Sequence, residues 1–183
     1  MKALFALPLA LLLVAPLSAQ SLPSDDFAMG PVFKDHGPNA EVAATVPIPA
    51  GTVFKVAFDA EERSAGIGAN RTLVSAMRLI NMHTRAGVPV ENTKVAVVVH
   101  GSAVGDLLNV EAYAERYDGT ENPTAQVLQL LLDHDVKVIV CGQSAAAQGI
   151  DETSDFVEDV DVALSAMTAH ALLQQDGYTV NPF

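Results

Sequence analysis

The sequence predicts an α/β fold: a three-layer sandwich in which a mainly parallel, doubly wound sheet lies between helices. Short apolar runs alternate along the chain with segments of helical periodicity. The runs are nearly continuous, as in strands covered on both faces. Half of the 183 residues are hydrophobic, which is enough for one buried core. Right-handed βαβ crossovers then place helices on both faces of the sheet.

The first 19 residues have the features of a secretory signal peptide. Lys2 supplies a positive charge, residues 4–14 form an apolar run, and a small residue, Ala19, precedes the expected cleavage site. An uncleaved N-terminal anchor is the alternative, although the run is shorter than the ~20 residues of a membrane span. We expect an exported protein, located in a bacterial periplasm, with no membrane span after removal of the signal.

Residues 20–52 are predicted to be an N-terminal arm, and residues 53–183 the α/β domain. Proline and glycine recur through the arm, and because proline fixes φ and lacks an N–H, the arm should be extended and irregular. The domain starts with residues 53–58, a β-branched and aromatic strand that ends at Asp59. A helix over residues 70–86 follows, with Asn70 as its N-cap.

The rest of the domain continues the alternation of strands and helices. Residues 94–99 and 136–140 are apolar runs that predict two central strands, followed by His100 and by Cys141. The remaining predictions are helices at residues 107–117, 123–134, 145–148 and 165–175, and strands at residues 160–164 and 178–180.

The candidate site follows from the strand ends, because ligands of open α/β sheets bind outside the carboxyl ends of the strands. This rule selects Cys141 as the candidate catalytic residue. The predicted binding residues are Asp59, Asn70, His100, Gly101, Gly142, Gln143 and Ser144.

Cys141 is the only cysteine of the chain, so it cannot form an intramolecular disulfide. It precedes a predicted helical turn, whose N–H groups would favour the thiolate. Gly142 permits a sharp turn, and Gln143 and Ser144 can donate hydrogen bonds. His100 is a candidate base for Cys141 or an anion ligand. The alternatives are a buried cysteine that acts as a small hydrophobic residue and a histidine satisfied by backbone groups.

Several function classes are excluded or disfavoured. A net charge of −12 argues against a nucleic-acid binder. The loop that begins at Gly101 lacks the lysine of a phosphate-binding loop, and the chain lacks the H-E-x-x-H and G-x-S-x-G patterns of zinc and serine hydrolases. The acidic residues between 151 and 161 are expected to form a solvated face. No metal and no cofactor are predicted.

Five segments together resemble the DsrE/DsrF-like family, in its exported, single-cysteine branch. They are VAVVVHG (95–101), VIVCGQSAA (138–146), GI (149–150), VALSAMT (162–168) and LQQDGY (173–178). The resemblance implies a doubly wound fold, a homo-oligomer (trimer or hexamer) and sulfur relay through a persulfide on a cysteine after the third strand. Cys141 matches that position.

The leading hypothesis is therefore a periplasmic sulfur-handling protein, a persulfide carrier or sulfurtransferase that uses Cys141 with sulfur donor and acceptor proteins. The first alternative is a non-catalytic oligomeric binding or assembly module with a structural cysteine. The second is a thiol redox sensor, which would form a reversible sulfenate or intermolecular disulfide.

Overall fold

The fold was analysed in a computed structural model that describes residues 24–64 and 68–181. The predicted signal peptide and its cleavage site lie outside the described residues. Within these two ranges, no helix has both the length and the apolar character needed to cross a bilayer.

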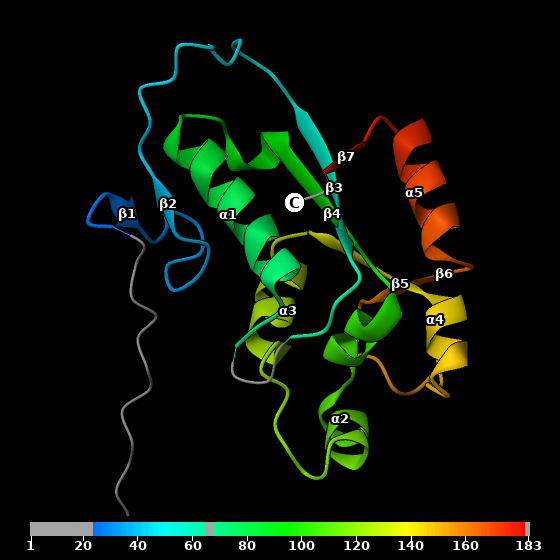
Figure 1. Cartoon of the computed structure of the whole chain (residues 1–183). Helices are drawn as coiled ribbons and strands as arrows, with labels where there is room; N and C mark the ends of the chain where they lie inside the picture. Colours follow the sequence, from blue (N-terminus) through cyan, green and yellow to red (C-terminus); the bar gives the residue numbers. More distant parts are fainter. Residues whose placement is uncertain (1–23, 65–67, 182–183) are drawn as a thin grey trace, which may run out of the picture.

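The domain is built on a five-stranded sheet in the order β6-β5-β4-β3-β7, and every pair of neighbouring strands is parallel. The predicted α/β sandwich with a doubly wound parallel sheet is therefore confirmed (Figure 1). The strands are β3 (Phe54–Ala60), β4 (Thr93–Val99), β5 (Lys137–Cys141), β6 (Asp161–Ala163) and β7 (Thr179–Asn181).

Two helical layers cover the sheet unequally. α1 (Arg71–Arg85) and α3 (Ala125–Leu132) pack on one face, and α5 (Ala166–Gln175) crosses the other face between the edge strands β6 and β7 (Figure 1). The shorter helices lie beyond the carboxyl ends of the central strands. They are η2 (Gly101–Leu107, a 3₁₀ helix), α2 (Val110–Arg116) and α4 (Gly142–Ala147); a further 3₁₀ turn, η1 (Val90–Asn92), precedes β4.

The hydrophobic core is divided by the sheet. The larger cluster, on the α1 and α3 face, includes Leu73, Met77 and Leu128, all fully buried. The smaller cluster, on the α5 face, is centred on Val98 and Leu173. Because side chains alternate along a strand, β4 contributes to both clusters, which explains its nearly continuous apolar sequence.

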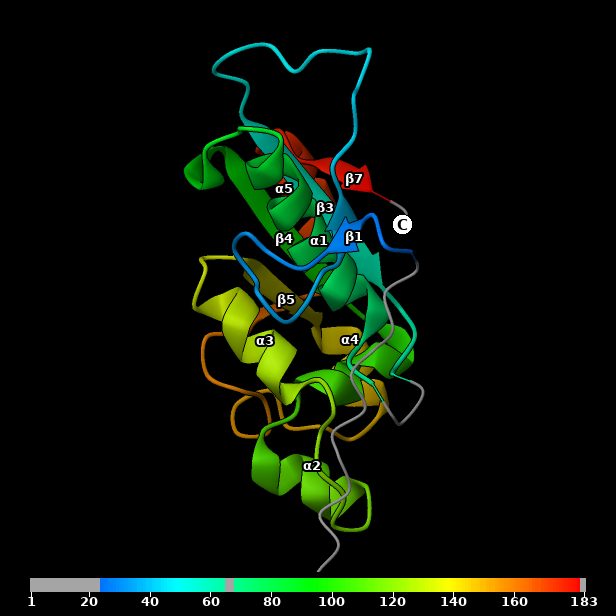
Figure 2. The ribbon, with the colours of Figure 1, turned by 90° about the vertical axis from the view of Figure 1, so that its left-hand side faces the viewer.

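The described part of the N-terminal arm is mostly irregular, with several bends and turns, and packs on α1. It contains one short antiparallel pair, β1 (Phe27–Ala28) with β2 (Asn39–Ala40). Figure 2 shows this part of the arm in front of α1. The buried side chain of Asn81 on α1 accepts hydrogen bonds from two arm N–H groups, at 2.9 and 3.0 Å, and donates to three arm carbonyls. These hydrogen bonds attach the arm together with Phe33, which is buried in the larger core cluster.

Three predicted boundaries are wrong in ways that affect the site. The first strand continues through Asp59 to Ala60, because β3 pairs with β4 up to Val99. The predicted helix over 107–117 is two helices, η2 and α2, interrupted where Asn109 caps α2 by accepting a hydrogen bond from the N–H of Ala112 at 2.9 Å. The short helix expected at 145–148 begins at Gly142, directly after Cys141.

Candidate functional site

Three of the predicted residues lie side by side at the carboxyl end of the sheet. Ala57 and Val98 belong to the core cluster under α5, and the residues two positions further on, Asp59 and His100, project from the same face. Val99 pairs with Val140, so His100 and Cys141 each follow one member of this pair, at the ends of neighbouring strands whose backbones lie ~4.8 Å apart in a sheet. Asp59, His100 and Cys141 therefore form one row beneath the start of α5.

Cys141 is 5 % exposed, and its sulfur accepts several hydrogen bonds. Burial raises the pKa of the thiol. The Ser144 hydroxyl and the backbone N–H groups of Ser144, Ala166 and Gln143 donate to the sulfur and outweigh burial, so the pKa of Cys141 lies below its ordinary value. Two of these N–H groups start α4, whereas that of Ala166 starts α5. These donors favour the anionic form of Cys141.

Ser144 also connects Cys141 to the loop after β4. Its hydroxyl oxygen accepts a hydrogen bond from the N–H of Gly101 at 3.1 Å. One turn further along α4, the Gln148 amide donates to the carbonyl of Gly101 at 2.7 Å. The structure thus joins Gly101 and Ser144, as the sheet topology suggested, and holds the β4 loop against α4.

Two glycines allow these close approaches. Gly101 has φ of +55°, and a Cβ there would lie 2.9 Å from the carbonyl oxygen of Glu61. A Cβ on Gly142 would lie 3.0 Å from the carbonyl oxygen of Ala163, in the neighbouring strand β6. Larger side chains would force apart the loops that surround the sulfur, so both residues serve the site through their backbone.

Asp59 lies between two histidines. One carboxylate oxygen is 2.7 Å from Nε2 of His170 on α5, and the other is 3.1 Å from Nε2 of His100. Partial burial raises the pKa of Asp59, but hydrogen bonding and charge interaction with His100 and His170 outweigh burial and hold the pKa below its ordinary value of 3.8. The carboxylate is therefore ionised at neutral pH.

Asn70 is the predicted binding residue that the structure places in another network. It is the N-cap of α1, as expected, and accepts a hydrogen bond from the N–H of Thr72 at 3.0 Å. Its amide donates to the buried carboxylate of Asp106 at 2.8 Å and to the carbonyl of Glu62 at 3.0 Å. Asn70 is 1 % exposed, so we assign it a structural role in anchoring the loop before α1.

Sequence reasoning missed three contributors: His170, Gln148 and the N–H of Ala166. His170 shares no metal-ligand spacing with the other histidines, so no sequence motif singles it out. A usable signal is its place one helical turn after Ala166, since residues i and i+4 share a face of a helix. Gln148 was counted as the end of the short helix, and its side chain reaches Gly101 because α4 starts earlier than predicted.

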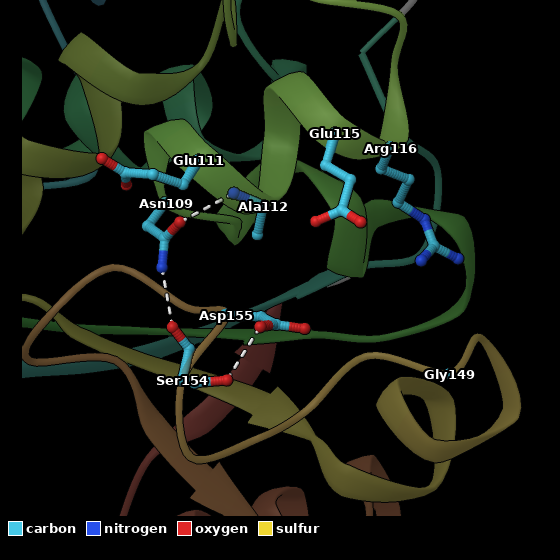
Figure 3. A pocket seen from close by; sticks show the side chains of 8 residues that line it. All are labelled: Asn109, Glu111, Ala112, Glu115, Arg116, Gly149, Ser154 and Asp155. Carbon is cyan, nitrogen blue, oxygen red and sulfur yellow. Dashed lines mark hydrogen bonds between the residues drawn. The ribbon is translucent and has the colours of Figure 1, made fainter.

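A hollow lies apart from this row of residues. It has a volume of about 450 Å³, and Figure 3 shows the polar side chains of α2 on one side and the segment around Ser154 on the other. Asn109 spans the two sides by donating to the carbonyl of Ser154 at 2.8 Å. Another hollow, of about 670 Å³, lies between the arm and the C-terminal end of α1. Neither is lined by a predicted site residue.

Over residues 24–64 and 68–181, no group of three or more His, Cys, Asp or Glu side chains is arranged to hold a metal ion. The row at the sheet end instead combines a thiol with several donors, a neighbouring imidazole and a carboxylate. A cysteine whose pKa is lowered by hydrogen-bond donors is an activated nucleophile. The chemistry it suits is nucleophilic attack by Cys141.

Comparison with known proteins agrees with this fold. The model of the DsrE/DsrF-like family matches residues 55–182. A protein of unknown function from Methanobacterium thermoautotrophicum, MTH1491, is 21 % identical with a TM-score of 0.52, over 71 % of this chain and 99 % of that one. The YchN protein from E. coli is 17 % identical with a TM-score of 0.51, over 72 % and 100 %. No curated protein matched the sequence. The chain therefore belongs to the DsrE/DsrF-like family.

Proposed function

We propose that this protein is a periplasmic sulfur carrier that holds transferable sulfur as a persulfide on Cys141. The family is generally linked to sulfur relay. The observation that carries the proposal is the set of donors around the Cys141 sulfur, from the Ser144 hydroxyl and three backbone N–H groups. Such donors stabilise a thiolate and would equally stabilise the anionic persulfide formed from it.

The proposed transfer needs no cofactor. The Cys141 thiolate attacks the terminal sulfur of a donor persulfide, R–S–SH. A bond forms between that sulfur and Sγ, the donor's S–S bond breaks, and its electron pair leaves on R–S⁻, which then takes up a proton. An acceptor thiolate removes the sulfur by the same exchange and releases Cys141 as thiolate. One cysteine is sufficient, because the second thiol always belongs to a partner.

The burial of Cys141 restricts which sulfur donors can reach its sulfur atom. With 5 % of the residue exposed, the sulfur suits a small polysulfide or a persulfide on a protruding side chain or peptide. The same burial favours the second candidate function, a non-catalytic assembly module with a structural cysteine. Thiol titration separates the two: in the carrier, Cys141 reacts in the folded protein, whereas a structural cysteine reacts only after unfolding.

Intact-mass analysis after incubation with polysulfide tests the proposal directly. We expect an adduct of one sulfur atom that is removed by a thiol reductant and absent in Cys141→Ser. Absence of the adduct from the wild type, or its persistence in Cys141→Ser, would rule out the carrier function. Reversible oxidation by peroxide without a sulfur adduct would instead favour the redox sensor.

A matched pair of serine variants tests the role of the donors. Ser144→Ala removes the hydroxyl that lowers the pKa of Cys141, so the pH midpoint of iodoacetamide alkylation should move upward. Ser102→Ala, at a serine that bonds to Arg63 and Glu61 instead, should leave the midpoint unchanged. Equal midpoints in both variants would show that the hydroxyl does not act on the thiol.

We further propose that the protein is a homo-oligomer, a trimer or hexamer, since members of the family are often oligomeric. Sedimentation of the protein should give a mass that is a multiple of the 19.2 kDa chain, less any removed signal peptide. A monomer at all accessible concentrations would refute this part.

A further inference from the structure

We propose that Asp59 and His170 are positioning residues that hold His100 in one tautomer, so that His100 exchanges a proton with the sulfur site at Cys141. This inference rests on the proposed function and extends it to two residues outside the segment that contains the cysteine. His170 belongs to the last helix, and Asp59 to the first strand of the large sheet.

The direction of each hydrogen bond follows from the charge of Asp59. An ionised carboxylate only accepts hydrogen bonds. Both imidazoles contact it through Nε2, His170 at 2.7 Å and His100 at 3.1 Å, so both must carry a proton on Nε2. In the neutral ring of His100 the other nitrogen, Nδ1, is then the base that takes up or returns a proton.

His170 is suited to hold the Asp59 carboxylate in a fixed orientation. Its side chain is 18 % exposed, and its Nδ1 is buried without a hydrogen-bond partner among the described residues. A proton on that nitrogen would be a buried donor without an acceptor, which is unfavourable. His170 therefore donates through Nε2 and restricts the rotation of the Asp59 carboxylate.

His100 is the residue of this hydrogen-bonded series that would exchange a proton. It directly follows Val99, whose strand partner Val140 precedes Cys141, and it is more exposed than His170, at 24 % of its side chain. In the transfer step, His100 would accept the proton when Cys141 becomes a thiolate and return it to the leaving thiolate R–S⁻. The proton balance closes without an external acid: one proton leaves the Cys141 thiol and one is gained by the released donor thiol.

Nitrogen-15 NMR of the full chain tests the tautomers without any sulfur transfer. We expect two-bond correlations that show His100 and His170 protonated on Nε2 at neutral pH, assigned by their loss in His100→Gln and His170→Gln. In Asp59→Asn, His100 should lose its preference for this tautomer. An unchanged His100 pattern in Asp59→Asn would overturn the inference.

A matched pair at His170 tests the effect on Cys141. Gln places an N–H donor near the position of Nε2, whereas Phe keeps the ring without a donor. His170→Phe and Asp59→Asn should slow alkylation and sulfur uptake about tenfold, since a well-placed general acid or base contributes roughly 10²- to 10⁴-fold. The rates of His170→Gln should stay within about twofold of wild type. His134→Gln, at a histidine bonded to Leu130, is the control.

The outcomes distinguish this inference from the proposed function. If the wild type takes up no sulfur, the carrier function is wrong. The histidine tautomers and the alkylation rates still test whether Asp59 and His170 position His100. If the wild type takes up sulfur and His170→Phe matches His170→Gln in rate, the positioning role of Asp59 and His170 is refuted and the carrier function stands. A lowered melting temperature in Asp59→Asn with wild-type rates would show a purely structural role and would also overturn the inference.

Discussion

The face of the sheet under α1 and α3 and the face under α5 differ in how completely they are covered. The first carries the larger cluster of buried residues and also the docked arm. The second is covered by one helix of ten residues, and several large apolar side chains at its margin are exposed, among them Leu164 and Met167, at 72 and 81 %. The candidate site lies at the end of this less covered face.

The difference separates two tasks. The α1 and α3 face supplies most of the apolar burial, and with it most of the stability. The α5 face therefore tolerates polar groups, including Asp59 and a partly exposed His100, at the strand ends. We expect substitutions on the first face to affect folding mainly, and those on the second to affect reactivity mainly.

The largest expected effect tests the first half of this comparison. Leu128 on α3 is fully buried in the larger cluster, and Leu128→Ala should lower the free energy of unfolding by about 3 kcal/mol through lost burial and a cavity. Leu173→Ala, in the smaller cluster, should cost about 2 kcal/mol. Denaturant titration measures both. A larger loss for Leu173→Ala would reverse the assignment of the two faces.

A smaller effect is expected where the arm is attached. Asn81→Ala leaves five arm backbone groups without the side chain that binds them, and should lower stability by about 2 kcal/mol. The arm should also be cut faster by proteases within residues 24–52. Gln129→Ala, on the exposed side of α3, is the control. Unchanged cleavage of the arm would mean that Asn81 does not anchor it.

The acid dependence of stability should differ between the two buried or half-buried carboxylates. The pKa of Asp59 is lowered from 3.8 by its histidines, so it stabilises the fold above that pH and this contribution is lost on acidification. Burial raises the pKa of Asp106 despite hydrogen bonds from Asn70 and Ser64, so its contribution is present below 3.8 and is lost as pH rises through the folded pKa.

Unfolding titrations between about pH 5 and about pH 3 measure these opposite signs. Relative to wild type, Asp59→Asn should lose less stability on acidification, whereas Asp106→Asn should lose more. The slope with pH is the quantity to compare, because each substitution also changes hydrogen bonds. Parallel slopes in all three proteins would contradict both assignments.

The smallest effect is expected on the margin of the α5 face. Met167 is 81 % exposed, so Met167→Ser should change the unfolding free energy of the isolated chain by no more than about 0.5 kcal/mol. A loss comparable with that of Leu173→Ala would show that this margin is covered in the folded protein. The measurement is best made at the lowest accessible protein concentration.

The sequence predicted the strands and the place of Cys141 because both depend on local patterns. Apolar runs mark β4 and β5, and the cysteine follows directly on the second run. The position of Asp59 inside β3 was not predictable in the same way, since strand length was decided by pairing with β4. The start of α4 at Gly142 was missed because glycine is a poor helix former.

Contacts between distant segments were beyond the sequence patterns. Asn81 is a polar residue on an amphipathic helix and would be placed at the solvent side; it is buried because the arm supplies partners for its amide. His170 meets Asp59 across 111 positions of sequence. Pairings of this kind depend on the crossing of α5 over the sheet, which periodicity alone does not specify.

The backbone N–H that begins α5 has a consequence for synthesis of the protein. The cysteine and its nearest donors are translated well before Ala166, yet that N–H also bonds the sulfur. A nascent chain that has emerged only as far as α4 therefore carries a thiol of more ordinary reactivity. The complete set of donors to the sulfur is therefore assembled only when α5 docks on the sheet.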